Sequence, residues 1–331
     1  MSIEKVLRHN WTKEEVLSIY NSPLLELIYK AATVHREWHN SEEVQISTLL
    51  SVKTGGCPED CSYCGQAARY HTDIKVQALL PTETVLAHAK KAKETGSSRF
   101  CMAAAWREVR DNKDFDRIID MVKGVNELGL EVCCTLGMLT EDQANRLQEA
   151  GLYAYNHNLD TSEEFYDKII STRTFDNRIE TIKNVRKAGI TVCSGGIIGL
   201  GEKIEDRIAM LITLGNMEVH PESVPINALA RVPGTPLEFL PKIDVWEMVR
   251  TIATARIIMP SSMVRLSAGR IEMNEVEQAW CFMAGANSIF TGERETLLVT
   301  PNPGVSEDML MLQNLGLKPM KSEKEVSCIP H

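Results

Sequence analysis

The sequence predicts an α/β fold, a TIM-type (β/α)8 barrel preceded by a helical extension and followed by an irregular tail. Eight short β-rich runs alternate with amphipathic stretches, at roughly one βα unit per 30 residues. This alternation is typical of parallel strands covered by helices. The length of 331 residues suits one such barrel.

The elements are assigned in chain order. Residues 1–44 are expected to be helical and to pack outside the barrel, with an apolar face made of Leu24, Leu25, Leu27 and Ile28. The barrel is expected over 45–303, with strands at 45–52, 98–106, 131–137, 153–160, 190–200, 223–229, 262–268 and 288–292. The helical stretches between them include 114–128, 140–150, 174–188, 204–215, 244–258 and 274–284. Four glycines are candidate helix terminators: Gly129, Gly151, Gly189 and Gly285.

Two points complete the predicted fold: the structure of the C-terminal tail and the architecture that competes with the barrel. The tail, 304–331, is acidic, then Lys-rich and broken by proline, and is expected to be irregular. An open doubly wound sheet is the competing architecture. The glycines at 195, 196, 199 and 201 do not fit G-x-G-x-x-G, so the dinucleotide-binding version of that sheet loses its main support. The same glycines let the backbone at the end of the fifth strand approach a ligand closely.

Composition excludes several classes of protein. The net charge of −9 argues against a general nucleic-acid binder, which would show a basic surface. The first ten residues do not resemble a signal peptide, and no run of about 18 apolar residues predicts a membrane span. We therefore expect a cytoplasmic protein, in which the nine cysteines are metal ligands or buried apolar residues rather than disulfides.

Cys57, Cys61 and Cys64 lie in a glycine-led loop, Gly-Gly-Cys-Pro-Glu-Asp-Cys-Ser-Tyr-Cys. Four thiolates are the usual ligands of a [4Fe–4S] cluster, so three leave one iron open to a small molecule. The alternative is a zinc site with His71 as the fourth ligand. Structural zinc sites more often use paired C-x2-C hooks, and this loop has one such pair, so the sequence favours the cluster.

A second set of candidate ligands lies inside predicted strands: Cys101, Cys133, Cys193 and Arg265. Lumen-facing side chains of different barrel strands converge, and thiolates suit an iron–sulfur cluster better than a hard cation. Each cysteine alone is more simply a small buried residue. Cys133 and Cys134 must point to opposite faces, and periodicity does not say which faces the lumen. A guanidinium has no acceptor, so chemistry alone has Arg265 pair with a carboxylate or donate to cluster sulfides.

Polar residues also follow the fourth predicted strand. Asn156, Asn158 and Asp160 share one face, because their spacing is i, i+2, i+4. Amide and carboxylate groups suit ribose hydroxyls or a urea-like group, whereas a solvated strand end is the simpler explanation. Asn227 is a similar lone polar residue in an apolar run.

The pattern C-x3-C-x-aromatic-C, with Tyr63 as the aromatic residue, resembles the signature of radical S-adenosylmethionine enzymes. Over residues 12–317 the chain more closely resembles the biotin synthase family. The segments that carry this resemblance are 57–64 (CPEDCSYC), 99–106 (RFCMAAAW), 155–161 (YNHNLDT), 192–202 (VCSGGIIGLGE) and 264–270 (VRLSAGR). The first motif alone indicates only the superfamily, whereas all five in this order are specific.

The resemblance implies a role for each candidate residue. Cys57, Cys61 and Cys64 would hold a [4Fe–4S] cluster that binds S-adenosylmethionine, and a [2Fe–2S] cluster would be held by Cys101, Cys133, Cys193 and Arg265. It thus implies Cys133 rather than Cys134, and Arg265 as a ligand. The remaining cofactor contacts would be Tyr63 beside the adenine, Asn158 and Asp160 at the ribose, and Arg178 at the carboxylate. The substrate contacts would be Asn156, Asn158, Asn227 and Thr300. No catalytic residue beyond the cluster ligands is implied.

The activity implied is that of a sulfurtransferase that inserts sulfur into dethiobiotin to form biotin, the last step of biotin biosynthesis, with the [2Fe–2S] cluster as sulfur donor. The partners implied are a flavodoxin- or ferredoxin-like electron donor, the iron–sulfur assembly machinery and a second copy of the chain in a homodimer. Where similar enzymes can carry a Thr-Thr pair for the substrate carboxylate, this chain has Val299-Thr300, after a loop near 293–296 that is longer than in some relatives. The alternatives are another radical enzyme with an auxiliary cluster, or a non-catalytic metal-binding protein.

Overall fold

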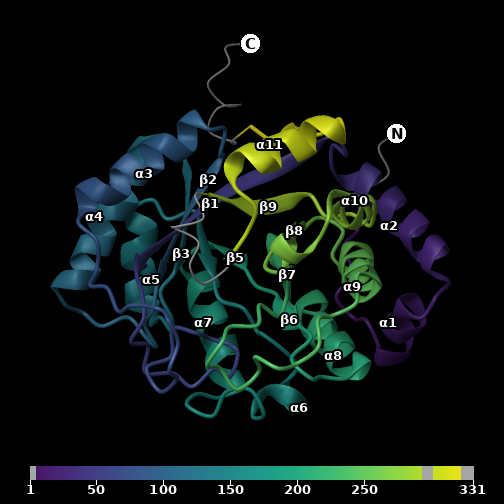
Figure 1. Ribbon diagram of the computed structural model, residues 1–331, viewed down its shortest axis with the longest axis horizontal. Helices are drawn as coiled ribbons and strands as arrows, with labels where there is room; N and C mark the ends of the chain where they lie inside the picture. Colours follow the sequence, from purple (N-terminus) through teal and green to yellow (C-terminus); the bar gives the residue numbers. More distant parts are fainter. Residues whose placement is uncertain (1–4, 293–300, 322–331) are drawn as a thin grey trace.

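The computed structural model describes residues 5–292 and 301–321, and it shows a closed barrel of parallel strands (Figure 1). The ring contains eight strands, because β9 pairs with β1 and closes the sheet. In ring order they are β1 (Glu43–Lys53), β2 (Arg99–Ala104), β3 (Glu131–Thr135), β4 (Ala154–Asn156), β5 (Thr191–Cys193), β7 (Ser223–Ala228), β8 (Met263–Leu266) and β9 (Ser288–Thr291). Each overlaps a predicted run, and β1 extends past both ends of its run, so the barrel is confirmed.

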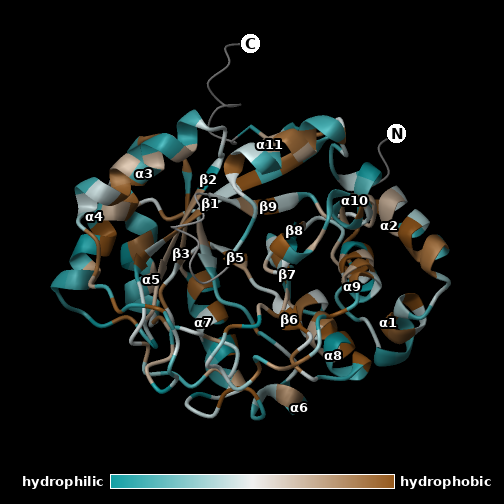
Figure 2. Ribbon diagram, viewed as in Figure 1, coloured by the Kyte–Doolittle hydropathy of each residue, from teal (hydrophilic) through white to brown (hydrophobic). Residues whose placement is uncertain are grey.

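Helices surround the ring and separate consecutive strands. They are α3 (Thr82–Glu94), α4 (Lys113–Glu127), α5 (Glu141–Glu149), α6 (Glu163–Tyr166), α7 (Phe175–Lys187), α8 (Ile204–Gly215), α9 (Val245–Ile258), the 3-10 turn η1 (Arg270–Glu272) and α10 (Glu275–Met283). The four glycines predicted to end helices all have positive φ angles, between 75° and 104°. Figure 2 shows hydrophobic and hydrophilic residues alternating along α3 and α4, as expected of helices with one face on the strands. No helix in the described part of the chain is long and apolar enough to cross a membrane.

The segment predicted to be helical, 1–44, contains two helices, α1 (Lys13–Tyr20) and α2 (Leu24–Trp38), whereas residues 5–12 are not helical and β1 already begins at Glu43. Both helices pack against α9, outside the ring of strands (Figure 1). Leu27 and Ile28 are buried in this contact, whereas Leu25 is 70% exposed. The prediction that Leu25 belongs to the apolar face was wrong, because its position in the helix turns it away from α9.

The predicted fifth strand is divided into two. β5 ends at Cys193, and a separate strand β6 (Gly196–Ile198) pairs farther along β7. A Cβ atom added to Gly195, at the break, would lie 2.0 Å from the carbonyl oxygen of Pro225. Two backbones therefore approach each other here as closely as glycine permits. β4 is also shorter than predicted, and the chain beyond it reaches β6 through a bridge between Asp160 and Gly196.

The prediction of an irregular tail was wrong for its described part. Residues Val305–Asn314 form α11, and β10 (Lys318–Pro319) pairs with the start of β1. Met311 and Leu312 are buried, and Asp308 forms a buried ion pair with Arg270. The lysines and proline that suggested irregularity follow this helix rather than interrupt it. The remaining tail, 322–331, lies outside the described residues.

Candidate active site

A cavity of about 240 Å³ lies at the carboxyl ends of the barrel strands and is bordered by both predicted sets of cysteines. Cys64 comes from the loop after β1, whereas Cys101 and Cys133 come from β2 and β3. The fold therefore brings two groups of thiols that are far apart in the sequence to one enclosed space. This is the end of the barrel at which (β/α)8 enzymes carry their active sites.

The cysteine loop is closed by backbone hydrogen bonds. The N–H of Cys57 donates to the carbonyl of Gln66 at 2.9 Å, and the N–H of Ala68 donates back to the carbonyl of Cys57 at 2.8 Å. Within the loop, the N–H of Cys64 donates to the carbonyl of Cys61 at 2.9 Å. The three thiols are thus fixed relative to one another by the backbone.

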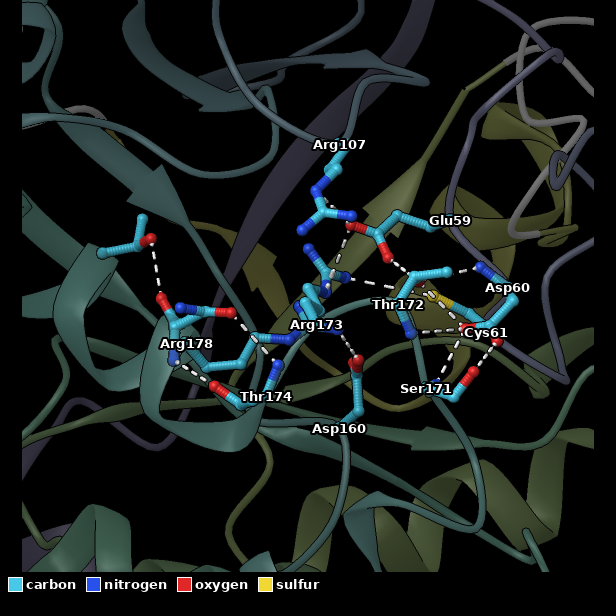
Figure 3. Close-up of polar contacts among 12 residues, drawn as sticks. Glu59, Asp60, Cys61, Arg107, Asp160, Ser171, Thr172, Arg173, Thr174 and Arg178 are labelled. Carbon is cyan, nitrogen blue, oxygen red and sulfur yellow. Dashed lines mark hydrogen bonds and ion pairs between the residues drawn. The ribbon is translucent and has the colours of Figure 1, made fainter.

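The segment after α6 anchors this loop through Asp60 (Figure 3). The Asp60 carboxylate accepts four hydrogen bonds from the N–H and hydroxyl groups of Ser171 and Thr172, and a fifth from Nη1 of Arg69 at 2.8 Å. Burial alone would raise the pKa of Asp60, but these hydrogen bonds outweigh it and lower the pKa to about 2. Ser62 adds a backbone hydrogen bond to the carbonyl of Ile169 at 2.9 Å. The loop is therefore tied to a segment about 110 residues away in the sequence.

A guanidinium faces the middle cysteine. The Nη2 atom of Arg173 lies 3.9 Å from the sulfur of Cys61. Glu59 lies between two arginines, with its Oε1 atom 3.9 Å from Nε of Arg173 and 3.6 Å from Nε of Arg107 (Figure 3). Sequence reasoning missed these residues. Glu59 and Asp60 inside the cysteine motif were a signal that cationic or hydroxyl partners were needed, but nothing local identifies Arg173.

The loop thiols are held in a neutral form in the absence of metal. Burial raises the pKa of Cys61 to about 11 and that of Cys64 to about 12. The thiolate is the form that binds a metal, so binding here must release protons. Soft thiolate donors suit iron–sulfur clusters.

A single metal ion needs its ligands close together. Across residues 5–292 and 301–321, no three His, Cys, Asp or Glu side chains converge closely enough to hold a single metal ion. A zinc site built from the loop cysteines and His71 would require such a group. A cluster makes a different demand, because each thiolate binds a different iron atom around its surface. The three loop cysteines fit a cluster better than a single ion.

Two of the three barrel cysteines, Cys101 and Cys133, face each other across neighbouring strands. Cys101 pairs in register with Cys133, and Cys193 pairs with Asn156. Cys133 packs with Cys101 and Phe290 on the lumen side, whereas Cys134 packs into the core under the helices. The structure therefore distinguishes the two adjacent cysteines, which periodicity alone could not do.

Arg265 extends into the lumen and is completely buried. Its Nη1 atom lies 3.8 Å from the sulfur of Cys193, and its Nε atom donates to the Ser288 hydroxyl at 2.9 Å. Among the described residues, no carboxylate forms an ion pair with it, so the predicted alternative of a lumen carboxylate partner finds no support. Burial alone would raise the pKa of Cys101, but a hydrogen bond with Cys133 and the charges of Arg265 and Arg99 outweigh it and lower the pKa.

The four polar residues singled out from the sequence, Asn156, Asn158, Asp160 and Asn227, all border the same cavity. Asn156 donates to the hydroxyl of Thr135 at 3.1 Å, and its carbonyl oxygen is buried without a partner. Asn227 is held by the carbonyl of Gly196 at 2.9 Å and by the N–H of Ala268 at 3.1 Å. The free acceptor of Asn156 is available to an N–H donor of a ligand.

Three of the four predicted cofactor residues, Tyr63, Asp160 and Arg178, form one hydrogen-bonded group. Asp160 accepts a hydrogen bond from the Tyr63 hydroxyl at 2.8 Å and pairs with Arg178. Asn158 accepts from the N–H of Gly195 at 3.2 Å. Asp160 has a φ of 70°, a left-handed conformation that turns its carboxylate into this group. Thr300, the remaining predicted site residue, lies outside the described residues, as do Val299 and the loop near 293–296.

Comparison with known proteins gives the family. Residues 51–214 match the model of the Radical SAM superfamily, and residues 225–318 match the Biotin and Thiamin Synthesis associated domain. The biotin synthase of Cytophaga hutchinsonii is 68% identical over 318 residues, covering 96% of this chain and 94% of that protein. The biotin synthase of Flavobacterium psychrophilum is 61% identical over 322 residues, covering 97% of this chain and 88% of the relative.

Solved structures share the fold at lower identity. The structure of methylornithine synthase has a TM-score of 0.79 at 18% identity and covers 96% of both chains. The structure of HydG, a maturase of the [FeFe]-hydrogenase, also has a TM-score of 0.79, at 19% identity, and covers 96% of this chain and 76% of that one. These likenesses support the barrel alone. The full-length identity to curated relatives is what assigns the sequence, and the chain belongs to the biotin synthase family of radical S-adenosylmethionine enzymes.

Proposed function

We propose that this chain forms biotin from dethiobiotin in the cavity between the two sets of cysteines, with the following division of roles. Cys57, Cys61 and Cys64 hold the [4Fe–4S] cluster, and the [2Fe–2S] cluster is held by Cys101, Cys133, Cys193 and Arg265. The observation that carries this proposal is that Cys64, Cys101 and Cys133 border one cavity together with Asn156 and Asn227. A substrate in that space lies between both sets of ligands.

The reaction requires groups that the side chains do not supply. The carbon–hydrogen bonds to be replaced in dethiobiotin are unactivated, so no general base could remove a proton from them. When bound, the two clusters and S-adenosylmethionine supply the electron, the radical chemistry and the sulfur. The protein's part is to bind and orient the substrate and to exclude water.

The polar wall of the cavity suits these tasks. The free carbonyl oxygen of Asn156 accepts an N–H of the ureido ring, and the fixed amide of Asn227 lines the same cavity. Asp160 and Asn158 are placed for ribose hydroxyls, with Tyr63 beside the adenine. Arg178, now paired with Asp160, supplies the cation for the cofactor carboxylate. Thr300 is proposed for the substrate carboxylate.

The proposal also covers the partner proteins of the chain, its oligomeric state, its compartment and its domain boundaries. An external one-electron donor of the flavodoxin or ferredoxin type, iron–sulfur assembly proteins to rebuild the consumed cluster, and a homodimer are all supported by the resemblance. A reducing compartment, the cytoplasm, suits a chain whose described cysteines are all free. The division into a helical extension over 1–44, a barrel over 45–303 and a tail over 304–331 also stays a proposal.

The test is anaerobic reconstitution with iron and sulfide, followed by mass spectrometry for biotin and 5′-deoxyadenosine. With dethiobiotin, S-adenosylmethionine and a reductant present, both products should form. Cys61→Ala should abolish both, whereas Cys193→Ala should abolish biotin and spare part of the cofactor cleavage. Absence of both products from the reconstituted wild-type protein, with both clusters present, would contradict the function. An unchanged biotin yield in Cys193→Ala would contradict the sulfur-donor role alone.

A further inference from the structure

We propose that Arg173 is a positioning residue that sets the reduction potential of the cluster on the cysteine loop, and that Glu59 opposes its effect. This inference rests on the proposed assignment of the [4Fe–4S] cluster to Cys57, Cys61 and Cys64. It concerns how readily that cluster accepts an electron from an external reductant, which loses one electron in the exchange.

The geometry directs Arg173 at a cluster ligand. Its Nη2 atom is 3.9 Å from the sulfur of Cys61, within range of an N–H···S hydrogen bond. The side chain is only 8% exposed, so bulk water screens its charge weakly. Figure 3 shows one contact from the guanidinium to Glu59 and another to Cys61.

Its charge is only partly balanced. The Nε atom of Arg173 is buried without a hydrogen bond, because the nearest carboxylate oxygen, on Glu59, is 3.9 Å away. Glu59 divides its interaction between Arg173 and Arg107, which lies 3.6 Å from the same oxygen, and its other carboxylate oxygen accepts a hydrogen bond from the Thr172 hydroxyl. The Oε1 atom of Glu59, which faces the two arginines, also lacks a hydrogen-bond donor. The net field that reaches Cys61 from this group is therefore positive.

The loop has several anchors other than Arg173. Ser171 and Thr172 provide four hydrogen bonds to Asp60, Arg69 provides a fifth, and Ser62 bonds the backbone of Ile169. Arg173 takes no part in these contacts. A buried guanidinium directed at a ligand sulfur acts through its charge on the cluster that this sulfur binds.

The sign of that consequence follows from charge. Reduction adds one negative charge to the cluster, and both a nearby cation and an N–H···S bond stabilise the reduced form. Arg173 should therefore make the potential less negative. Glu59 should make it more negative, because its carboxylate lies beside the same cation. The two residues thus have opposite predicted effects, which a merely structural role would not produce.

The experiment is an anaerobic potentiometric titration of the reconstituted enzyme without S-adenosylmethionine, followed by electron paramagnetic resonance of the reduced [4Fe–4S] cluster. R173Q should shift the midpoint to a more negative potential, R173K should shift it less because it keeps the charge, and E59Q should shift it to a less negative potential. K187Q removes a surface lysine that is 62% exposed and should leave the midpoint unchanged.

Two results would overturn the inference. One is an R173Q protein with an intact cluster signal and the wild-type midpoint. If R173Q fails to assemble the cluster, R173K and E59Q provide the test instead. The second overturning result is then a wild-type midpoint in E59Q, or a shift of the midpoint in the same direction in R173K and E59Q. Failure of the underlying assignment is distinguishable, because the wild-type protein would then show no [4Fe–4S] signal at all.

Discussion

At the scale of single residues, cysteine serves two purposes in this chain, and the direction of the side chain decides which. Cys133 and Cys134 are adjacent and both are buried, yet one faces the lumen thiols and the other faces apolar helix residues. The same chemical group is therefore a candidate ligand in one position and a packing residue in the next. This difference makes the pair a matched test of the barrel site.

We predict opposite outcomes for serine at these two positions. Cys133→Ser should lose the [2Fe–2S] absorption after anaerobic reconstitution, because a lumen thiolate is removed. Cys134→Ser should retain that absorption and lower the free energy of unfolding by about 1–3 kcal/mol, since a hydroxyl replaces a thiol in an apolar core. Optical spectra and urea denaturation of both variants would check this. Loss of the cluster in Cys134→Ser alone would contradict the assignment.

Asp60 gives a prediction about pH. Its folded-state pKa of about 2 lies below the ordinary value of about 3.9, so its contribution to stability is present above pH 4 and is lost as the pH falls toward 2. Asp60→Asn should therefore lower the free energy of unfolding of the metal-free protein by about 2 kcal/mol at pH 7. The difference from wild type should shrink between pH 4 and pH 2.

Urea denaturation across this pH range would measure the effect. Asp116→Asn is the control, because Asp116 forms an ion pair with Arg146 in which the two side chains are 62% and 41% exposed. This change should alter the free energy of unfolding by less than about 1 kcal/mol. A difference between Asp60→Asn and wild type that stays constant from pH 7 to pH 2 would show that the carboxylate charge is not what anchors the loop.

At the scale of elements, α11 is held to the barrel by the buried ion pair between Asp308 and Arg270. Arg270 is fully buried and also donates to the Phe290 carbonyl at 2.8 Å. Asp308→Ala should lower the free energy of unfolding by about 3–5 kcal/mol, because it leaves a buried cation uncompensated. Glu272→Ala, which removes a half-exposed partner of Arg231, should cost about 1 kcal/mol or less. Equal losses in the two variants would contradict this account of α11.

The elements also show what the sequence could and could not predict. The strands were predictable because each is a short β-rich run, and helices before several of them end at a glycine such as Gly151 or Gly189. The break between β5 and β6 was not, since it depends on the approach of Gly195 to Pro225 from another strand. The sequence analysis did not predict α11 for a different reason. The lysines and proline that follow the helix dominated the composition of the tail and so suggested an irregular segment.

Some residues of the candidate site could likewise be predicted from the sequence, and others could not. Ligands that share a loop or follow strand periodicity were identified from their spacing and from resemblance. Contacts between distant segments, such as that of Arg173 with Cys61, leave no local pattern, because only the closed barrel brings residues 59–62 and 169–173 together. The lumen position of Cys133 likewise required the three-dimensional structure.

At the scale of the whole molecule, the two cysteine sets differ in which part of the fold must open before a cluster can leave: the loop for one set and the barrel for the other. Cys101, Cys133 and Cys193 lie inside the ring of strands and are at most 3% exposed. In the loop above the ring, Cys57 and Cys61 are 9% and 6% exposed, and Cys64 is partly exposed. Local opening of a loop costs less free energy than opening of a closed barrel, for which the cost approaches that of global unfolding.

An iron chelator under anaerobic conditions should therefore remove the [4Fe–4S] cluster several-fold faster than the [2Fe–2S] cluster, as followed by Mössbauer spectroscopy of the iron-57 enzyme. Urea below the unfolding transition should sharpen the contrast. Loss from the barrel should accelerate steeply with urea, because its opening exposes much surface, whereas loss from the loop should respond weakly. Equal urea dependence of the two rates would mean that both clusters leave through the same opening, and that the barrel does not protect its own thiols.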